Sequence, residues 1–260
     1  MVALLLVTFA VYSPGLSGPY LLDDIPNLQT IGDIGVVSSR ENLSQYVFGN
    51  ISGPLGRPVS MASFLLDAQD WPANPANFKY TNLMLHLLCG VLLFHLGMLL
   101  FGFCLPGQQR NQAPILATLL AGLWLLHPLN LSTTLYIVQR MTQLMTLFSL
   151  AALLCFCSGR MLLARTRIRG YILICASLFP FGLLAVLSKE NGALLLMLIV
   201  ALEVTVFRKL ATEPLFKWWL RLAVIIPIFL VLGYLAYTLP DSLLRFETRP
   251  FSLAERLMTE

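Results

Sequence analysis

The chain alternates between long runs of apolar residues and shorter polar connections, and this pattern predicts seven membrane-crossing helices. A helix needs about 20 apolar residues to cross the hydrocarbon core of a bilayer, and several nearly uncharged stretches approach that length. The expected crossings cover residues 1–16, 78–101, 113–126, 141–157, 171–187, 193–207 and 222–239. The predicted fold class is an all-α integral membrane protein, with one membrane domain over residues 1–260.

The longest polar stretch, residues 17–77, separates the first two crossings and is expected to form an outer loop. It carries six acidic residues, Asp23, Asp24, Asp33, Glu41, Asp67 and Asp70, and two basic residues, Arg40 and Arg57. Two segments, 41–48 and 59–66, have the composition of short amphipathic helices that lie on the membrane surface. The second follows Pro58, a residue well suited to a first helical turn. Residues 240–260 are expected to form an outer tail.

Composition supports the membrane class. Hydrophobic residues make up 57% of the chain and charged residues 12%, and the mean hydropathy is +0.77. These values exclude an ordinary soluble domain. The five cysteines lie in or beside apolar segments without a CxxC pair, which disfavours a disulfide framework or a zinc site. No positive residues precede the first apolar segment, so it is interpreted as a membrane helix rather than a signal peptide.

Positive charges predict the orientation. If the crossings alternate, the connections at 160–169 and 208–221 fall on one side with four bases each, and the positive-inside rule makes that side cytoplasmic. A set of ionisable residues then gathers at the outer rim: Asp23, Asp24, Arg57, His86, His127, Arg140, Lys189 and Glu190. Ionisable groups near membrane depth are costly and usually face a cavity or a partner.

The adjacent carboxylates of Asp23 and Asp24 are the candidate catalytic groups. Adjacent acids repel each other, which raises one pKa and leaves that group able to hold or take a proton. Pro26 disfavours a helical conformation at Ile25, so we expect the pair at a helix end or in a turn. The alternative interpretation is a solvated turn outside the membrane with no chemical role.

The other rim residues also have structural interpretations. Arg57 can cap a loop, and His127 can mark a helix end. His86 lies one turn after Asn82 on the same helix face, a pattern typical of an interhelical hydrogen-bonded pair. Taken together, carboxylates and cations suit a reaction in which a base deprotonates a nucleophile while cations hold an anionic leaving group. Carboxylates with a histidine could also hold Mg, Mn or Zn, but no spacing is diagnostic of a metal, and the cofactor requirement stays open.

Several motifs occur in a characteristic order along the chain. They are Asp23-Asp24, Gly56-Arg57-Pro58, Asn82-Leu-Met-Leu-His86, His127-Pro128, Arg140, Leu187-Ser188-Lys189-Glu190-Asn191-Gly192 and the segment Arg249 to Thr259. This set resembles the membrane part of the transmembrane and tetratricopeptide-repeat O-mannosyltransferases and their bacterial relatives, in the GT-C glycosyltransferase superfamily. That family continues with more membrane helices and helical repeats. The resemblance therefore implies that residues 1–260 are the N-terminal part of a longer protein and inactive alone.

The resemblance implies an inverting transfer of a sugar, with a mannose-like hexose favoured, from a polyprenyl-phosphate donor to an acceptor hydroxyl on a protein or glycan. The implied location is a bacterial inner membrane, with the site facing the periplasm, and the implied partners include membrane lipid but no nucleic acid. Asp23 or Asp24 would be the base, while Arg57, Arg140 and Lys189 would hold the donor phosphate. The expected supporting residues are His86, His127, Glu190 and Asn82. Asn191 stands where many relatives have Gln, and the acceptor stays open.

The alternative function is a non-enzymatic membrane transporter or assembly protein. A transporter typically has Gly- or Pro-broken helices near the midplane, in corresponding positions of two halves. Pro180 and Pro227 interrupt the fifth and seventh predicted crossings, but no internal repeat relates them. Charged groups at the rim rather than the midplane favour the enzyme.

Overall fold

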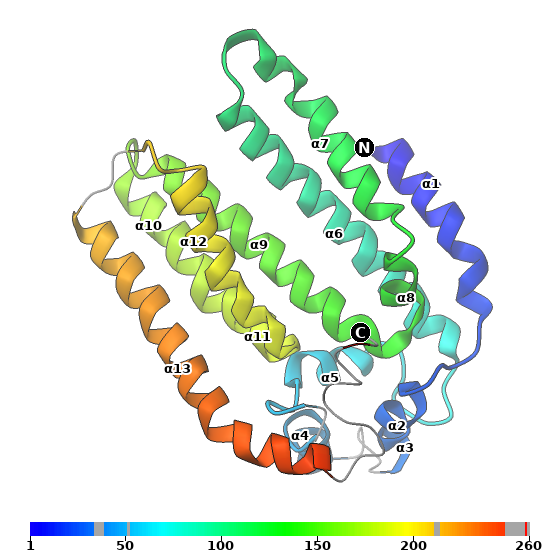
Figure 1. The fold of residues 1–260 in the computed structure, drawn as a ribbon. Coiled ribbons are helices and arrows are strands. Elements are labelled where there is room, and N and C mark those ends of the chain that lie inside the picture. The colour runs from blue at the N-terminus through cyan, green and yellow to red at the C-terminus, as the bar shows by residue number, and fades with distance from the viewer. Residues whose placement is uncertain (34–38, 51–52, 211–213, 248–257, 259–260) are drawn as a thin grey trace. The chain divides into compact units, whose positions relative to one another are not determined.

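The computed structural model describes residues 1–33, 39–50, 53–210, 214–247 and 258. The described residues are 80% helical, and no strand occurs among them. It divides into two units, Met1–Phe207 and Arg208–Glu260, of which the first carries every candidate site residue. Figure 1 shows the order of the helices along the chain.

Three helical segments in the described part of the chain are long and apolar enough to cross a membrane. The first is α6, Pro75–Cys104, and the second, Ile137–Leu162, comprises the 3₁₀ turn η3 (Ile137–Gln139) and α9 (Arg140–Leu162). The third joins α10 (Arg167–Ala176), a π turn (Ser177–Gly182) and α11 (Leu183–Ser188). The π turn contains Pro180, which has no N–H for the regular helical bond. An all-α fold of the described residues, with helices long and apolar enough to span a membrane, is therefore confirmed.

The remaining apolar helices are shorter or lie in the second unit. Helix α1 (Val2–Tyr12) continues into the 3₁₀ turn η1 (Ser13–Ser17), while α7 (Ala113–Leu125) has 13 residues. The 3₁₀ turn η5 (Glu190–Leu194) leads into α12 (Leu195–Thr205), of 11 residues. At 1.5 Å per residue, α7 and α12 extend about 20 and 17 Å, less than the hydrocarbon thickness of about 30 Å. In the second unit, α13 spans Pro214–Glu247. The number of crossings stays a prediction.

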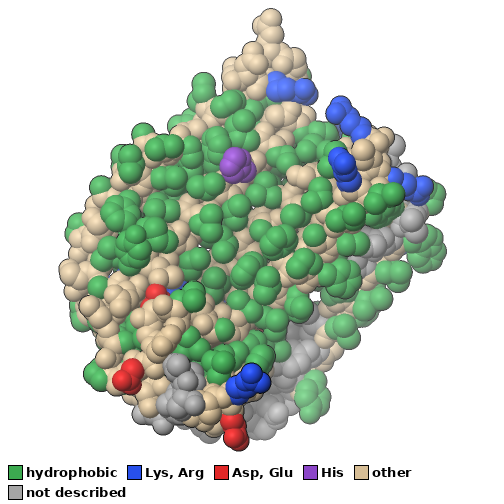
Figure 2. Space-filling view, turned by 180° about the vertical axis from the view of Figure 1, so that it is seen from behind, with side chains coloured by type: hydrophobic (Ala, Val, Ile, Leu, Met, Phe, Trp, Pro, Cys, Tyr) green, Lys and Arg blue, Asp and Glu red, His purple; other side chains and the backbone are tan. Residues whose placement is uncertain are grey.

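Helix α6 lies between α7 and α9, and α10 and α11 pack on α9 (Figure 1). Small residues allow close approach between these helices, as is typical of membrane bundles. A Cβ added at Gly97 of α6 would lie 3.2 Å from the Cβ of Ala117 in α7. At the other contact, a Cβ at Gly159 of α9 would lie 2.8 Å from the carbonyl oxygen of Gly170 in α10. Hydrophobic side chains dominate the face of the molecule seen in Figure 2.

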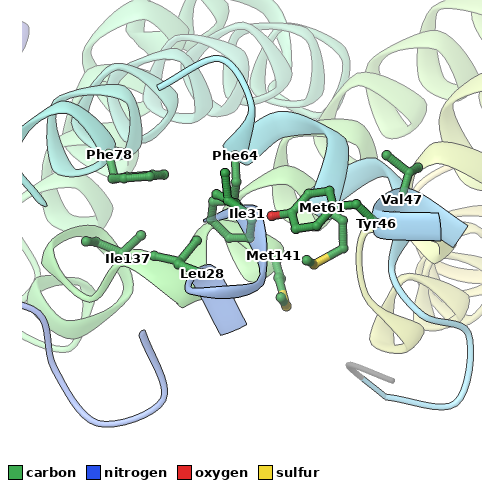
Figure 3. Close-up of a cluster of buried hydrophobic side chains, with 9 residues drawn as sticks. All are labelled: Leu28, Ile31, Tyr46, Val47, Met61, Phe64, Phe78, Ile137 and Met141. Atoms are coloured by element: carbon green, nitrogen blue, oxygen red, sulfur yellow. The ribbon is translucent and has the colours of Figure 1, made fainter. Parts of the chain in front are cut away.

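The segment before α6 folds into four short helices over the ends of α6 and α9. They are α2 (Asp24–Leu28), α3 (Thr30–Asp33), α4 (Arg40–Phe48) and α5 (Pro58–Phe64), and the last two match the short helices predicted at 41–48 and 59–66. Their apolar faces share one buried cluster, composed of Leu28, Ile31, Tyr46, Val47, Met61, Phe64, Phe78, Ile137 and Met141 (Figure 3). These short helices therefore form a small packed layer fixed on the ends of α6 and α9.

The two basic connections differ from the sequence-based expectation. Arg160, assigned to the first basic loop, lies inside α9 and forms a buried ion pair with Glu203 of α12. The exposed bases of that connection are Arg165, Arg167 and Arg169. Lys217 and Arg221, assigned to the second loop, lie in the first turns of α13. The predicted loops were too long because α9 continues past Arg160 and α13 begins before Lys217.

Candidate functional site

Asp24 is a buried carboxylate enclosed by backbone N–H groups. Leu21 N–H donates to Oδ2 at 2.8 Å and Val138 N–H donates to Oδ1 at 2.9 Å, and the residue is 0% exposed. Burial raises the pKa of Asp24. The backbone N–H groups of Leu21, Val138 and Ile137 and the charge of Lys79 lower it, but burial has the larger effect. Asp24 therefore fixes the turn before α2 onto η3.

Asp23 precedes α2 and is exposed to solvent. Its backbone N–H donates to the Tyr136 hydroxyl at 3.0 Å, and its carboxylate also interacts with that hydroxyl. The expected turn position is correct for Asp23. Pro26, however, lies within α2, because a proline in the first turn removes no helical hydrogen bond. Of the two acids, Asp23 is the one that an external molecule can reach.

Lys79 belongs to this site, and the sequence reasoning missed it. It is 2% exposed in α6, and its Nζ donates to the carbonyl oxygen of Pro19 at 2.9 Å. Its charge acts on Asp24, so it ties the aspartate turn to the first membrane-spanning helix after it. A lysine in an amphipathic first turn gives no local signal of burial, since lysine is usually solvated at such a position.

Arg57 and Glu190 form a bidentate ion pair between two loops that are far apart in the sequence. Arg57 Nη2 lies 2.9 Å from Glu190 Oε2, and Arg57 Nε lies 3.1 Å from the same oxygen. Arg57 adopts the left-handed backbone conformation with φ 50°, which is uncommon for a residue with a side chain. A Cβ at Gly53, whose φ is +79°, would clash with Glu190 Oε1. The loop before Arg57 therefore packs directly on the ion pair.

Lys189 lies beside this pair as a second cation. Its Nζ donates to Thr142 Oγ1 at 2.8 Å, and Thr142 Oγ1 donates to Gln139. Burial and the neighbouring Arg57 charge lower the pKa of Lys189, and Glu190 opposes this effect. Burial alone would raise the pKa of Glu190, but the hydrogen bonds and charge of Arg57 lower it overall. Two cations and one carboxylate leave this cluster with one net positive charge.

Helix α5 is held at two points, and this fixes the position of Arg57 just before it. Ser60 Oγ donates to the carbonyl oxygen of Ser188 at 2.8 Å, which joins α5 to the end of α11. Arg140 Nη1 donates to the carbonyl oxygen of Ser63 at 3.0 Å, which joins α5 to α9. The anchored helix holds Arg57 against Glu190.

Arg140 is a buried structural residue rather than an accessible cation. It is 0% exposed, and its Nε donates to Asn82 Oδ1 at 2.7 Å. Its Nη2 donates to the carbonyl oxygen of Phe78 and pairs with Asp67 Oδ2. With the bond to Ser63, Arg140 donates three hydrogen bonds to the protein, and Asp67 balances its charge. The expected phosphate contact is not supported by this placement, since no face of the guanidinium is open to a ligand.

Asn82 and His86 have separate partners, although they share a face of α6. Asn82 Nδ2 donates to the carbonyl oxygen of Ile137 at 3.2 Å, so it works with Arg140 at the start of α9. His86 Nε2 lies 2.9 Å from the carbonyl oxygen of Leu125, and its ring stacks on Trp124 at 4.7 Å between centroids. Both are buried. They connect α6 to two different neighbours.

His127 lies at the exposed end of α7. Its Nδ1 accepts a hydrogen bond from Leu129 N–H at 3.3 Å, and its carbonyl oxygen accepts one from Asn130 N–H. These are local contacts that end a helix, and no hydrogen bond among the described residues joins His127 to the other candidates. The helix-end interpretation fits this geometry.

The turn η3 and the start of α9 connect the two groups of candidate residues. Val138 binds Asp24, the sulfur of Met141 accepts a bond from Arg57 at 3.3 Å, and Thr142 binds Lys189. Val138 and Thr142 are four residues apart, which corresponds to roughly 6–8 Å along a helix. The aspartate turn and the cationic cluster thus share one rigid support.

Within the described residues, no group of three or more His, Cys, Asp or Glu side chains could hold a metal ion. The chain matches no protein-family model, no curated protein and no solved structure. Its function is therefore argued from the chemistry of the site and the order of its motifs.

Proposed function

We propose that the chain is the membrane part of a GT-C-type glycosyltransferase with seven crossings. It moves a sugar, favoured as a mannose-like hexose, from a polyprenyl-phosphate donor to a hydroxyl of a protein or glycan at the outer face of the membrane. One observation carries this proposal. The turn with the exposed carboxylate and the cluster of net positive charge both bind the same helical segment, at η3 and the first turn of α9. A base and an anion site close together are what such a transfer needs.

Asp23 is the proposed general base. Its carboxylate takes the proton of the acceptor hydroxyl while the acceptor oxygen bonds to the sugar C1 and the bond from C1 to the phosphate oxygen breaks. The electron pair of that bond stays on the departing polyprenyl phosphate. Asp24 does not meet the acceptor in this scheme, because it is buried and its oxygens accept backbone N–H groups. It positions the turn that carries Asp23.

Arg57 and Lys189 are the proposed phosphate ligands. The donor phosphate carries one negative charge and gains a second when the sugar leaves, so cations held at this position stabilise the transition state more than the bound donor. Glu190 occupies the carboxylate-binding edge of Arg57 in this structure, and the donor phosphate takes its place there. Arg140 is left out of this site, and with Asn82 and His86 it supports the helices around it.

One observation favours the transporter alternative. The π turn at Pro180 interrupts a membrane-spanning segment, and such breaks are common at functional sites. Its surroundings are apolar, however, and the ionisable candidates lie at the helix ends. The enzyme accounts for more of the polar residues.

The decisive experiment compares Asp23→Asn and Asp24→Asn in the full-length protein. Asn keeps the size of the side chain but cannot accept a proton at neutral pH. We expect Asp23→Asn to lower the transfer rate by about 10²–10⁴ while binding of the polyprenyl-phosphate donor is retained. Asp24→Asn should lower thermal stability first, because one backbone N–H loses its acceptor. Normal turnover by Asp23→Asn would exclude the proposed mechanism.

A further inference from the structure

The turn that carries Asp23 exposes large apolar side chains. Leu22 is 86% exposed, Ile25 48% and Leu21 43%. The opposite side of the same short helix is fully buried, with Asp24 and Leu28 both 0% exposed. The side with Asp24 and Leu28 is therefore covered by the protein, while the apolar side formed by Leu21, Leu22 and Ile25 is exposed.

The backbone holds Leu22 outward at a cost in free energy. Its φ is 36°, in the region where a side chain is rarely accommodated. The turn is fixed on both sides of Leu22, because Leu21 N–H binds the Asp24 carboxylate and Asp23 N–H binds Tyr136. Gly or Asn would adopt this conformation with less strain. A leucine in this strained conformation indicates that its exposed side chain has a functional role.

The turn lies close to the ends of two apolar helical segments. The apolar segment Val2–Ser17 ends four residues before Leu21, and a chain extends at most about 3.6 Å per residue, so the two are within roughly 14 Å. Lys79, near the beginning of the membrane-spanning α6, holds Pro19 by a hydrogen bond. Both connections tie the turn to the ends of helices that enter the membrane.

We propose that Leu21, Leu22 and Ile25 insert into the outer leaflet of the membrane, at the boundary between headgroups and acyl chains. Residues 18–29 contain two aspartates and no lysine or arginine, so burial of apolar area drives the insertion and anionic headgroups do not. Insertion places Asp23 at the level of lipid phosphates. This last consequence rests on the proposed function, because that is where the scissile bond of a polyprenyl-phosphate donor would lie.

Spin labelling tests the insertion without reference to catalysis. Native cysteines are replaced in the full-length protein, and a nitroxide is attached at Leu22→Cys in phosphatidylcholine nanodiscs. We expect oxygen, which partitions into lipid, to relax the label more than a water-soluble nickel chelate does. The matched control is Asp70→Cys, an exposed charged position of the same outer segment, where the chelate should dominate. A label at Ile25→Cys repeats the measurement with Leu22 intact.

Each outcome decides the proposal. Oxygen-dominated relaxation at both apolar positions, unchanged in 1 M salt where the Debye length falls to about 3 Å, supports insertion by apolar contact. Chelate-dominated relaxation at positions 22 and 25 would overturn it. Labels shielded from both agents would also overturn it, since they would reveal a protein cover in place of lipid. The labelling result does not depend on sugar transfer. The insertion proposal can therefore be wrong while the proposed function is right, and the proposed function can be wrong while insertion is observed.

Discussion

Asp23 and Asp24 have the same side chain, but their surroundings give them different chemistry. Asp24 is buried, and burial raises its pKa although backbone N–H groups accompany the charge. A carboxyl group whose pKa is raised in the folded protein adds to the free energy of unfolding when it is protonated. This contribution is fully present below its unfolded-state pKa and is lost as pH rises through its folded-state pKa. Asp23 is exposed and free to meet a substrate. Burial, and not repulsion by Asp23, is therefore the cause that raises the pKa of Asp24.

The proposed phosphate site predicts a contrast between three cations. Arg57→Gln and Lys189→Gln should each weaken polyprenyl-phosphate binding by about ten- to a hundredfold, the value of one charge-assisted hydrogen bond of about 1.5–3 kcal/mol. Donor binding is measured by titration of the purified full-length protein. Arg140→Gln is the matched control, and its main effect should be reduced stability because it is buried. Unaltered affinity in both Arg57→Gln and Lys189→Gln would remove them from the site.

The ion pair of Arg57 and Glu190 predicts a pH dependence of stability. Arg57 lowers the pKa of Glu190 in the folded protein, so the unfolded chain binds more protons as pH falls below about 4.5. The stabilisation is present above that pH and is lost as pH falls through the folded value. The difference in melting temperature between the parent and Glu190→Gln should shrink from pH 7 toward pH 3. A difference that does not change with pH would contradict the pairing.

Arg140 joins three helices, and this predicts a large effect of removing it. Arg140→Met leaves the Asp67 carboxylate buried without its cation, a change that typically costs about 3–5 kcal/mol. The double variant Arg140→Met with Asp67→Asn should recover part of this loss, since no unpaired charge remains. Thermal unfolding in detergent gives the comparison. If the double variant is less stable than Arg140→Met, the ion pair is not what makes this arginine necessary.

The ion pair of Arg160 and Glu203 joins α9 to α12 by two short contacts, 2.9 Å from Nε and 2.8 Å from Nη2. Both side chains are at most 10% exposed. We expect Arg160→Met or Glu203→Leu alone to lower the melting temperature more than the two changes together, because one change leaves a buried charge. Additive losses in the double variant would show that the two side chains act independently.

The helices could be predicted from the sequence because long apolar runs have few alternatives in a membrane protein. Their ends could not, since Arg160 remains in α9 through a partner 43 residues away. For the candidate site too, some residues could be predicted from the sequence and others could not. Ordered motifs identified Arg57, Lys189 and Glu190, but the ligands of Asp24 are backbone N–H groups, and a backbone donor has no sequence pattern. Burial of Lys79 and Arg140 depends on packing, which local composition does not record.

For the whole chain, the predicted orientation puts the short helices before α6 outside and the connection between α9 and α10 inside. Ser38, an obvious labelling position from the sequence, lies outside the described residues, but Ser44 and Thr166 are both exposed. In a cysteine-free protein in intact cells, Ser44→Cys should react with an impermeant thiol reagent and Thr166→Cys should not. Labelling of both after permeabilisation is the control. The reverse pattern would place Asp23 on the wrong side for the proposed reaction.

The buried pair of Arg160 and Glu203 also has a consequence for how the protein is made. Ribosomes add about 5–20 residues per second, so the 43 residues between the two take roughly 2–9 s to synthesise. During that interval α9 already exists and Glu203 does not. A guanidinium is costly at membrane depth, so we expect the end of α9 to stay at the membrane surface until α12 has been made. The ion pair with Glu203 then allows α9 to reach its final depth, so we expect this step to come late in the synthesis of residues 1–207.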